Sequence, residues 1–411
     1  MSKLNLDLPI LLIDTSYWLY YRFFSLRNWY NRAYPEKYNN YNNDKNSFNA
    51  DYNWFEDEVF MTKYKKLFIE NIKKICKKFN TKLENVVFCI DCPHNEIWRK
   101  TYITNLNKEI DTNNKTIINK NDNDNKNETH KQQEQVQELI QDYKGTRLES
   151  HKKNRFNSFN IFNYMKTTFL PTLKDNSGAP LKIISCSQCE ADDIIGHLTL
   201  YIQTLKRETK PIIYILANDN DYLQICNNKV KLINGVGKII SVSQNGNGNG
   251  NGNGNNNGNN NGKLINGLGN IISGNKGENY YGDNYLLSKI LLGDKSDNIK
   301  CCVVNMGYIC SGIPNSNFKN VGKSCISKIF NNKELLKVFY DLLISIRNNT
   351  INGSDNNSGS DNNSDVGSFS GDDINKIIDI NKFKHNCIMM DFKMIPLDLK
   401  QTLYSLFNQF I

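Results

Sequence analysis

The sequence predicts an α/β protein, in which a mainly parallel sheet with flanking helices is joined to a small helical module. Short apolar runs recur along the first half of the chain, and segments with helical spacing of apolar residues lie between them. Strands that alternate with helices are typical of βαβ units, whose strands pair in parallel. After about residue 283 the chain reads instead as a series of short helices.

The expected elements follow in order along the chain. The first strand, residues 9–13, leads into a helical pattern that passes through Tyr17, Tyr20, Phe24 and Leu26. The other expected elements are a helix over 58–79, a strand over 85–90, a helix over about 156–170, a strand over 181–185, a helix over 191–205, a strand over 211–216 and a last apolar stretch over 387–395.

Three segments are too polar to form folded elements. Residues 104–130, 245–262 and 349–373 consist largely of Asn, Gly, Ser, Asp and Lys, and they cannot bury enough apolar surface to offset the entropy of ordering. We therefore expect inserts there. The expected division is an α/β domain over 1–240 with its insert at about 104–130, an Asn/Gly-rich insert and connection over 241–282, a helical module over 283–345, a low-complexity insert over 346–375, and a segment over 376–411 that packs back on the α/β domain.

Composition excludes some classes of protein. The 411 residues include 51 Lys+Arg and 42 Asp+Glu, and the resulting net charge of +9 favours an acidic partner. No apolar run reaches the roughly 18 residues of a membrane helix, and we expect no signal peptide. The 11 cysteines are too sparse for a disulfide scaffold, so we expect an intracellular, reducing compartment. The Cys-x-x-Cys pairs Cys89/Cys92 and Cys186/Cys189 read as small buried residues rather than zinc ligands.

Acidic residues stand where the expected strands end. Two strands close on aspartates, two more aspartates follow the strand over 211–216, the helix over 191–205 starts with three carboxylates, and the helical module adds a further pair. Because ligands of α/β sheets bind beyond the carboxyl ends of the strands, we expect these side chains to converge on one edge. The residues are Asp14, Asp91, Glu190, Asp192, Asp193, Asp219, Asp221, Asp294 and Asp297.

Taken singly, each carboxylate has another explanation, because strand-end aspartates often form turns or helix caps and acidic residues favour helix starts. Together they would repel one another unless cations neutralised them. Mg²⁺ and Mn²⁺ prefer oxygen ligands, and two such ions about 3.5–4 Å apart suit the hydrolysis of phosphodiesters. The set as a whole therefore predicts a site for two divalent cations.

Six blocks of sequence resemble, in order, the 5′-nuclease superfamily of flap endonucleases and 5′→3′ exonucleases, which includes the nuclease domain of bacterial DNA polymerase I and its phage relatives. The blocks are LLIDTSYWLYYRFF, FCIDCPHNEIWRK, YKGTR, CEADDIIG, NDNDYLQ and LLGDKSDNI. They span about residues 8 to 330, and the terminal NCIMMDFKMIP resembles the strand that closes the family's catalytic domain. The resemblance implies a PIN-like nuclease fold.

The resemblance also implies roles for single residues. Lys144 and Arg99 would stabilise charge on the transferring phosphate, as fixed cations do in phosphoryl chemistry. Arg22 matches the family's helix arginine, although an ion pair with a neighbouring carboxylate explains it equally well. Tyr143 would stack on a base or simply pack, and Arg147 closes the same DNA-binding block. Of the carboxylates, Asp14, Asp91 and Asp192 would surround one ion, Asp219, Asp221 and Asp297 the other, and Glu190, Asp193 and Asp294 would bridge or act through water.

The helical module resembles the family's helix–hairpin–helix variant, which grips the DNA backbone through main-chain amides and a potassium ion. Gly322, Lys323 and Ser324 would supply this hairpin, and a helix N-terminus after a glycine offers N–H groups to a phosphate. Asn320 stands where a glycine is usual, and this counts against the potassium ion.

The sequence thus predicts a monomeric, Mg²⁺- or Mn²⁺-dependent 5′→3′ exonuclease or flap endonuclease of DNA replication and repair. Its partners would be DNA with 5′ ends, flaps or nicks, or RNA–DNA hybrids, in the nucleus or wherever DNA is replicated. Two alternatives stay open. One is a related nuclease that acts mainly on RNA, and the other is a non-catalytic protein of the same fold that binds branched DNA.

Overall fold

The computed structural model describes residues 3–35, 52–106, 108, 143–144, 159–240, 264–265, 271–273, 282–304, 329–351 and 371–411. The chain forms two compact units. The first unit comprises Met1–His94, His151–Asn284 and Asp398–Ile411, and the second unit comprises Asn95–Ser150 and Tyr285–Leu397. Within the described ranges, no helix is long and apolar enough to cross a membrane.

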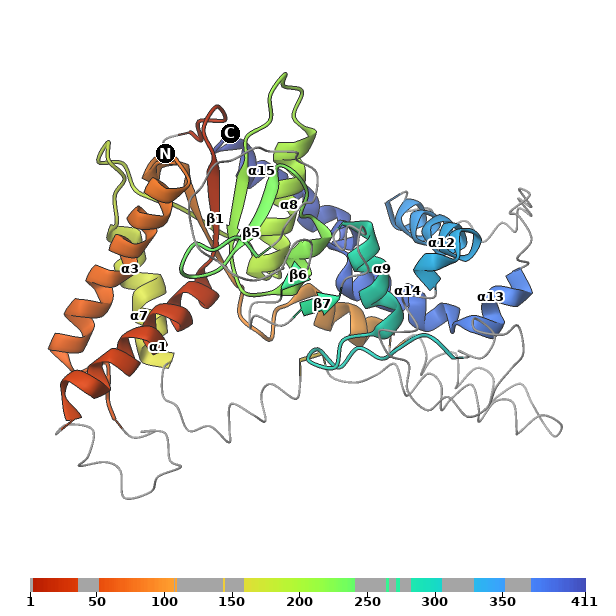
Figure 1. Ribbon diagram of the computed structural model, residues 1–411, viewed down its shortest axis with the longest axis horizontal. Coiled ribbons are helices and arrows are strands. Elements are labelled where there is room, and N and C mark those ends of the chain that lie inside the picture. Colours follow the sequence, from red (N-terminus) through yellow and green to blue (C-terminus); the bar gives the residue numbers. More distant parts are fainter. Residues whose placement is uncertain are drawn as a thin grey trace, which may run out of the picture. The chain divides into compact units, whose positions relative to one another are not determined.

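A five-stranded, all-parallel sheet forms the centre of the first unit, in the order β3-β2-β1-β4-β5 (Figure 1). This confirms the predicted fold class. The four expected strands are present. A fifth strand, not predicted from the sequence, lies at the edge of the sheet next to β4. The strands are β1 Ile10–Asp14, β2 Val86–Ile90, β3 Lys182–Ser185, β4 Ile213–Leu216 and β5 Val230–Ile233.

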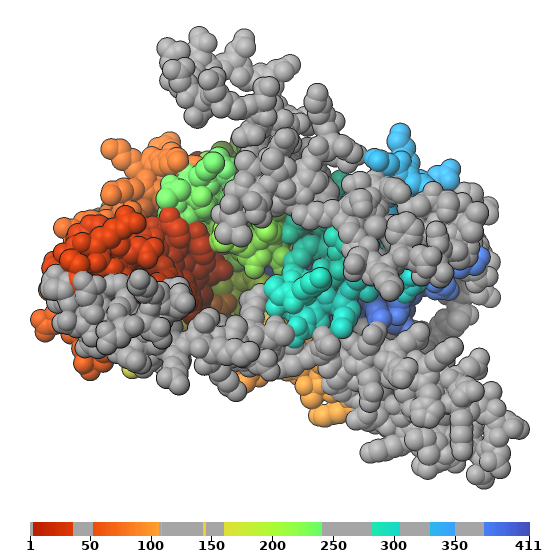
Figure 2. Space-filling model, turned by 60° about the horizontal axis from the view of Figure 1, so that its bottom comes forward, coloured from red at the N-terminus to blue at the C-terminus, as the bar shows by residue number. Residues whose placement is uncertain are grey.

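Aromatic side chains fill the core on one face of this sheet. Leu11 and Ile13 of β1 pack there with Phe23, Phe60 and Phe68, which come from helices α1 and α3. The outer side of α1 is exposed, as its red surface in Figure 2 shows. The elements on this side are α1 Thr15–Ala33, α3 Glu58–Lys78, α7 Phe159–Tyr164, the π-helical turn η2 Met165–Phe169 and the 3₁₀ turn η3 Leu170–Thr172.

The other face of the sheet is covered by α8, Ala191–Thr204. Side chains alternate along a strand, so Ile10 and Leu12 point away from the aromatic core. Helix α15, Leu397–Asn408, lies beside α8, where Tyr404 contacts Tyr201 with ring centroids 4.8 Å apart. The remaining elements of this unit are the 3₁₀ turns η1 Leu83–Asn85 and η4 Asn220–Gln224 and the antiparallel strands β6 Leu264–Ile265 and β7 Ile271–Ser273.

The second unit is helical. Phe339 and Phe383 are fully buried in its core, and a buried ion pair joins Arg347 Nε to Asp391 Oδ2 at 2.6 Å. Asn386 donates hydrogen bonds to the carbonyls of Ile290 and Lys300, both at 2.8 Å. Its elements are the helical residues 98–106, nearly all of α9 Asp283–Leu292, α12 Lys333–Ile351, α13 Gly371–Ile377, α14 Ile380–Met390 and the 3₁₀ turn η5 Phe392–Met394.

The terminal NCIMMDFKMIP, residues 386–396, resembles a strand of the family, and the expectation of a strand there is wrong. Residues 387–390 form the last turn of α14, and η5 follows. Asp379 caps the start of this helix by accepting a hydrogen bond from the Lys382 N–H, and Phe383, Cys387 and Met390 are buried along one side. This spacing of three and four residues buries a helical stripe, so the apolar run belongs to a helix.

Candidate metal centre

Asp14 stands at the junction of β1 and α1. It is the last residue of the strand and the N-cap of the helix, where its Oδ1 accepts a hydrogen bond from the Tyr17 N–H at 2.9 Å. A side-chain cap satisfies one of the free N–H groups at a helix start. The predicted alternative role as a cap is therefore real, and it fixes this half-buried carboxylate at the carboxyl end of the sheet.

Asp91 follows β2 directly and is held by two donors. Its Oδ1 accepts from the Ala191 N–H at 2.8 Å, and its Oδ2 accepts from the Ser16 hydroxyl at 2.5 Å. Ala191 is the first residue of α8 and Ser16 belongs to the first turn of α1. The carboxylate thus links two helix starts at the same edge of the sheet.

The start of α8 carries three carboxylates. Glu190 is the N-cap and forms a reciprocal capping box with Asp193, whose Oδ2 accepts from the Glu190 N–H at 3.1 Å. Asp193 is fully buried, Glu190 is 8% exposed, and Asp192 is half-buried. One oxygen from each lies within 4.8 Å of the others. Because carboxylate oxygens bind Mg²⁺, Mn²⁺ or Ca²⁺ at about 2.0–2.6 Å, one such ion fits among the three.

Asp219 and Asp221 follow β4. Asp219 is exposed and caps η4 by accepting from the Asp221 N–H at 2.9 Å, and Asp221 is half-buried. The next residue, Tyr222, is fully buried. Burial raises the pKa of its hydroxyl well above the usual value, and the charges of Asp14, Asp192 and Asp219 raise it further. Carboxylates from β1, α8 and the loop after β4 therefore all act on this one hydroxyl.

We call the carboxylates at this end of the first unit the acidic edge. Its members come from four separate chain segments, as the sequence predicts for the carboxyl ends of parallel strands. Burial raises the pKa of the Cys89 thiol as well, and Asp14 and Asp91 add to the effect. The acidic edge consists of Asp14, Asp91, Glu190, Asp192, Asp193, Asp219 and Asp221.

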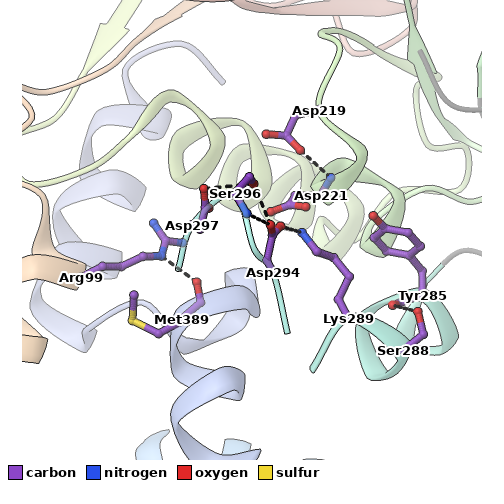
Figure 3. A network of polar contacts seen from close by, with 10 residues as sticks. All are labelled: Arg99, Asp219, Asp221, Tyr285, Ser288, Lys289, Asp294, Ser296, Asp297 and Met389. Carbon is purple, nitrogen blue, oxygen red and sulfur yellow. Dashed lines mark hydrogen bonds and ion pairs between the residues drawn. The ribbon is translucent and has the colours of Figure 1, made fainter. Parts of the chain in front are cut away.

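The second unit holds the other two predicted ligands in the turn after α9 (Figure 3). Burial alone would raise the pKa of Asp294, but the Lys289 ammonium, 2.8 Å away, and hydrogen bonds from Ser296 lower it to about 2. Both oxygens of Asp294 therefore have partners. Asp297 is 8% exposed, and its carbonyl accepts from the Lys144 N–H at 3.4 Å.

Tyr143 and Lys144 lie beside Asp297 within the second unit. The Tyr143 side chain is buried, and the Lys144 Nζ lies 4.9 Å from the centroid of its ring. The backbone of Lys144 has a φ of +59°, which is uncommon for a residue with a side chain and is found where the surroundings hold it. From the sequence, Tyr143 would either stack on a base or pack, and its burial favours packing.

The two predicted arginines differ in their surroundings. Arg99 is 2% exposed, and its Nε donates to the Met389 carbonyl at 2.9 Å (Figure 3). Its guanidinium lies over the ring of Trp98. This places it in the interior of the second unit. Arg22 is half-buried, with its guanidinium 4.4 Å from the ring centroid of Tyr21, and burial lowers its pKa.

Four predicted site residues fall outside the described residues, namely Arg147, Gly322, Lys323 and Ser324. The hairpin therefore stays a prediction, and the potassium ion, against which Asn320 counts, is untested. Two residues at the acidic edge were not identified from the sequence. Ser16 follows Asp14 by two positions, and Tyr222 follows Asp221. In the sequence they are marked only by their place beside the motif aspartates. Their role becomes visible when the strand ends are brought together in the fold.

No protein-family model and no curated protein matches the chain. Among solved structures, it is similar to a T5 protein co-crystallised with metal ions and to T5 5′-exonuclease with bound zinc, each at 10% identity and a TM-score of 0.45, with 98% of this chain and 99% of the other covered. It is also similar to the bacteriophage T5 flap endonuclease in a pseudo-enzyme–product complex with DNA and metal ions, at 11% identity and a TM-score of 0.38, with 98% of both chains covered. These proteins are of the class that the sequence motifs resemble. The likeness is distant, and the function proposed below rests on the residues of this chain.

Proposed function

We propose that this protein is a metal-dependent nuclease that hydrolyses DNA phosphodiesters near 5′ ends, as a 5′→3′ exonuclease or structure-selective flap endonuclease. The observation that carries the proposal is the acidic edge. Carboxylates from four chain segments meet at the carboxyl ends of a parallel sheet, and two of the three at the start of α8 are buried close together. Buried carboxylates without a neutralising charge are costly, and hard divalent cations are their natural partners.

In this proposal Asp14, Asp91 and Asp192 bind one cation, while Asp219 and Asp221 contribute to a second. Glu190 and Asp193, each with an oxygen within 4.8 Å of one from Asp192, bridge the cations or act through bound water. When bound, the cations would polarise the phosphodiester and the attacking water. The part of Asp294 and Asp297 in metal binding stays a prediction from the sequence.

The chain's own residues prepare the acidic edge for this reaction. The capping contacts of Asp14 and Asp193 hold carboxylates in fixed orientations, so little reorganisation is needed when a cation binds. The role of Lys144 as a cation for the charge that develops on the transferring phosphate stays a prediction from the sequence. Arg99 serves structure instead, because its buried guanidinium hydrogen-bonds to the Met389 carbonyl of α14.

A panel of 5′-labelled substrates tests this function. Purified protein is incubated with 5′-flap DNA, nicked duplex, an RNA primer on DNA and a matched RNA flap, each with Mg²⁺ or with EDTA. We expect Mg²⁺-dependent cleavage near the 5′ end of the DNA substrates, with 5′-phosphorylated products. Faster cleavage of the RNA flap would assign the enzyme to RNA, and binding of the flap DNA without any cleavage would identify a non-catalytic binding protein.

A further inference from the structure

Both oxygens of the Asp91 carboxylate accept hydrogen bonds, and the two donors belong to two different helices. Oδ1 accepts from a backbone N–H, at Ala191, and Oδ2 accepts from a side-chain hydroxyl, at Ser16. The backbone donor is independent of residue type, whereas the hydroxyl depends on one amino acid. Of these two contacts that orient Asp91, only the one from the Ser16 hydroxyl can be removed by substituting a side chain.

The position of Ser16 explains why it can reach this carboxylate. Strands β1 and β2 are adjacent and parallel, with Asp14 paired to Cys89, so Asp91 lies two residues beyond the level at which β1 ends. Helix α1 starts at Thr15 immediately after β1, and its capping by Asp14 sets the direction of the first turn. The half-buried hydroxyl of Ser16 thereby projects across to the neighbouring strand end.

We propose that Ser16 is a positioning residue, which holds the Asp91 carboxylate ready to bind a divalent cation; this inference rests on the proposed function. A carboxylate has about four lone-pair sites, so donors on both oxygens still leave sites for a cation. A hydrogen bond to an ionised acceptor is stronger than a neutral one and fixes its geometry. Partners that orient a metal ligand contribute about 10–100-fold to metal affinity.

The chain offers a matched control in the same helix. Ser25 is an exposed serine of α1, and its hydroxyl donates to the Tyr21 carbonyl at 2.7 Å. Ser16→Ala and Ser25→Ala therefore remove the same atom from the same helix, and only the first removes a contact with a carboxylate of the acidic edge. Ser16→Thr keeps a hydroxyl and should restore the contact.

The test is calorimetric titration of Mn²⁺ into the full-length wild type and each variant without substrate, together with the thermal unfolding midpoint of each. We expect Ser16→Ala to bind Mn²⁺ about tenfold more weakly at an unchanged midpoint, Ser16→Thr to recover affinity, and Ser25→Ala to match the wild type. Unchanged Mn²⁺ affinity in Ser16→Ala would overturn the inference, as would a loss that Ser16→Thr does not restore. If the wild type itself binds no Mn²⁺, the proposed function fails together with the inference. If the wild type binds Mn²⁺ and Ser16→Ala binds it equally, only the inference fails.

Discussion

Single residues at the acidic edge combine two tasks. Asp14 caps α1, Glu190 caps α8 in a capping box with Asp193, and Asp219 caps η4, while each also contributes negative charge at the end of the sheet. A cap contributes about 1 kcal/mol to helix stability, so these residues serve the fold even without a cation. The structural and functional explanations of strand-end aspartates are therefore compatible.

His385 provides a residue-scale prediction in the second unit. It is 8% exposed, and burial lowers its pKa from 6.5 to about 4. Between about pH 4 and pH 6.5, His385 is therefore protonated in the unfolded chain but neutral in the folded protein. The contribution of His385 to the free energy of unfolding is fully present above about pH 6.5. It is lost as the pH falls toward 4, and the total loss is about 3 kcal/mol.

Urea unfolding of the wild type and of His385→Met at pH 7.5 and pH 4.5 measures this effect. The substitution removes the titrating group and keeps a side chain suited to burial. We expect the wild type to lose more stability than the variant between the two pH values. An equal loss in both proteins would show that His385 is not the group responsible.

At the scale of elements, the sequence predicts four strands of the sheet correctly and fails for the fifth strand and for one C-terminal helix. Apolar runs identify β1, β2 and β4 because a strand that is covered on both faces is apolar throughout. Strand β3 contains Lys182 but is preceded by Leu181, whereas β5, which contains Lys231, lies between polar residues on both sides and was missed. The segment NCIMMDFKMIP resembles a strand of the family but is helical here, because a short apolar run fits a buried helix equally well.

For the candidate site, the carboxylates themselves could be predicted from the sequence. The motif aspartates and the strand ends that carry them are visible in the sequence. What holds each carboxylate is not, because Ser16 and Tyr222 reach the acidic edge only after distant segments fold together. Likewise, the burial of Arg99 depends on α14, which lies almost 300 residues away in the sequence.

The turn that follows α9 gives an element-scale prediction. Gly293 has a φ of +72°, and a Cβ there would lie 2.4 Å from the Ile299 carbonyl oxygen. Gly293→Ala therefore combines backbone strain with a clash against backbone, and we expect it to destabilise the protein by at least about 2 kcal/mol.

Gly178→Ala is the matched control. Gly178 has a φ of +85°, but a Cβ there would meet nothing within 4 Å, so only the strain of about 1 kcal/mol applies. Urea denaturation midpoints of both variants measure the difference. Equal midpoints would show that the close approach of the Ile299 carbonyl does not constrain this turn.

At the scale of the whole molecule, the distribution of charge matters more than its sum. The net charge of +9 arises although seven carboxylates gather at one edge of the first unit. Cations bound there would reduce the repulsion between the acidic edge and a phosphate backbone, and lysines and arginines elsewhere favour the approach of nucleic acid. The charge pattern is thus consistent with a nuclease.

The most direct measurement is the single-turnover rate of 5′-flap DNA cleavage in Mg²⁺ by the wild type and by Asp192→Asn. The Asn side chain retains an Oδ1 for the Asp193 N–H that Asp192 now accepts at 2.7 Å, so the fold should persist while the charge is lost. We predict DNA binding as in the wild type and cleavage slower by at least about 100-fold. Cleavage by Asp192→Asn at the wild-type rate would contradict the assignment of the acidic edge as the catalytic metal centre.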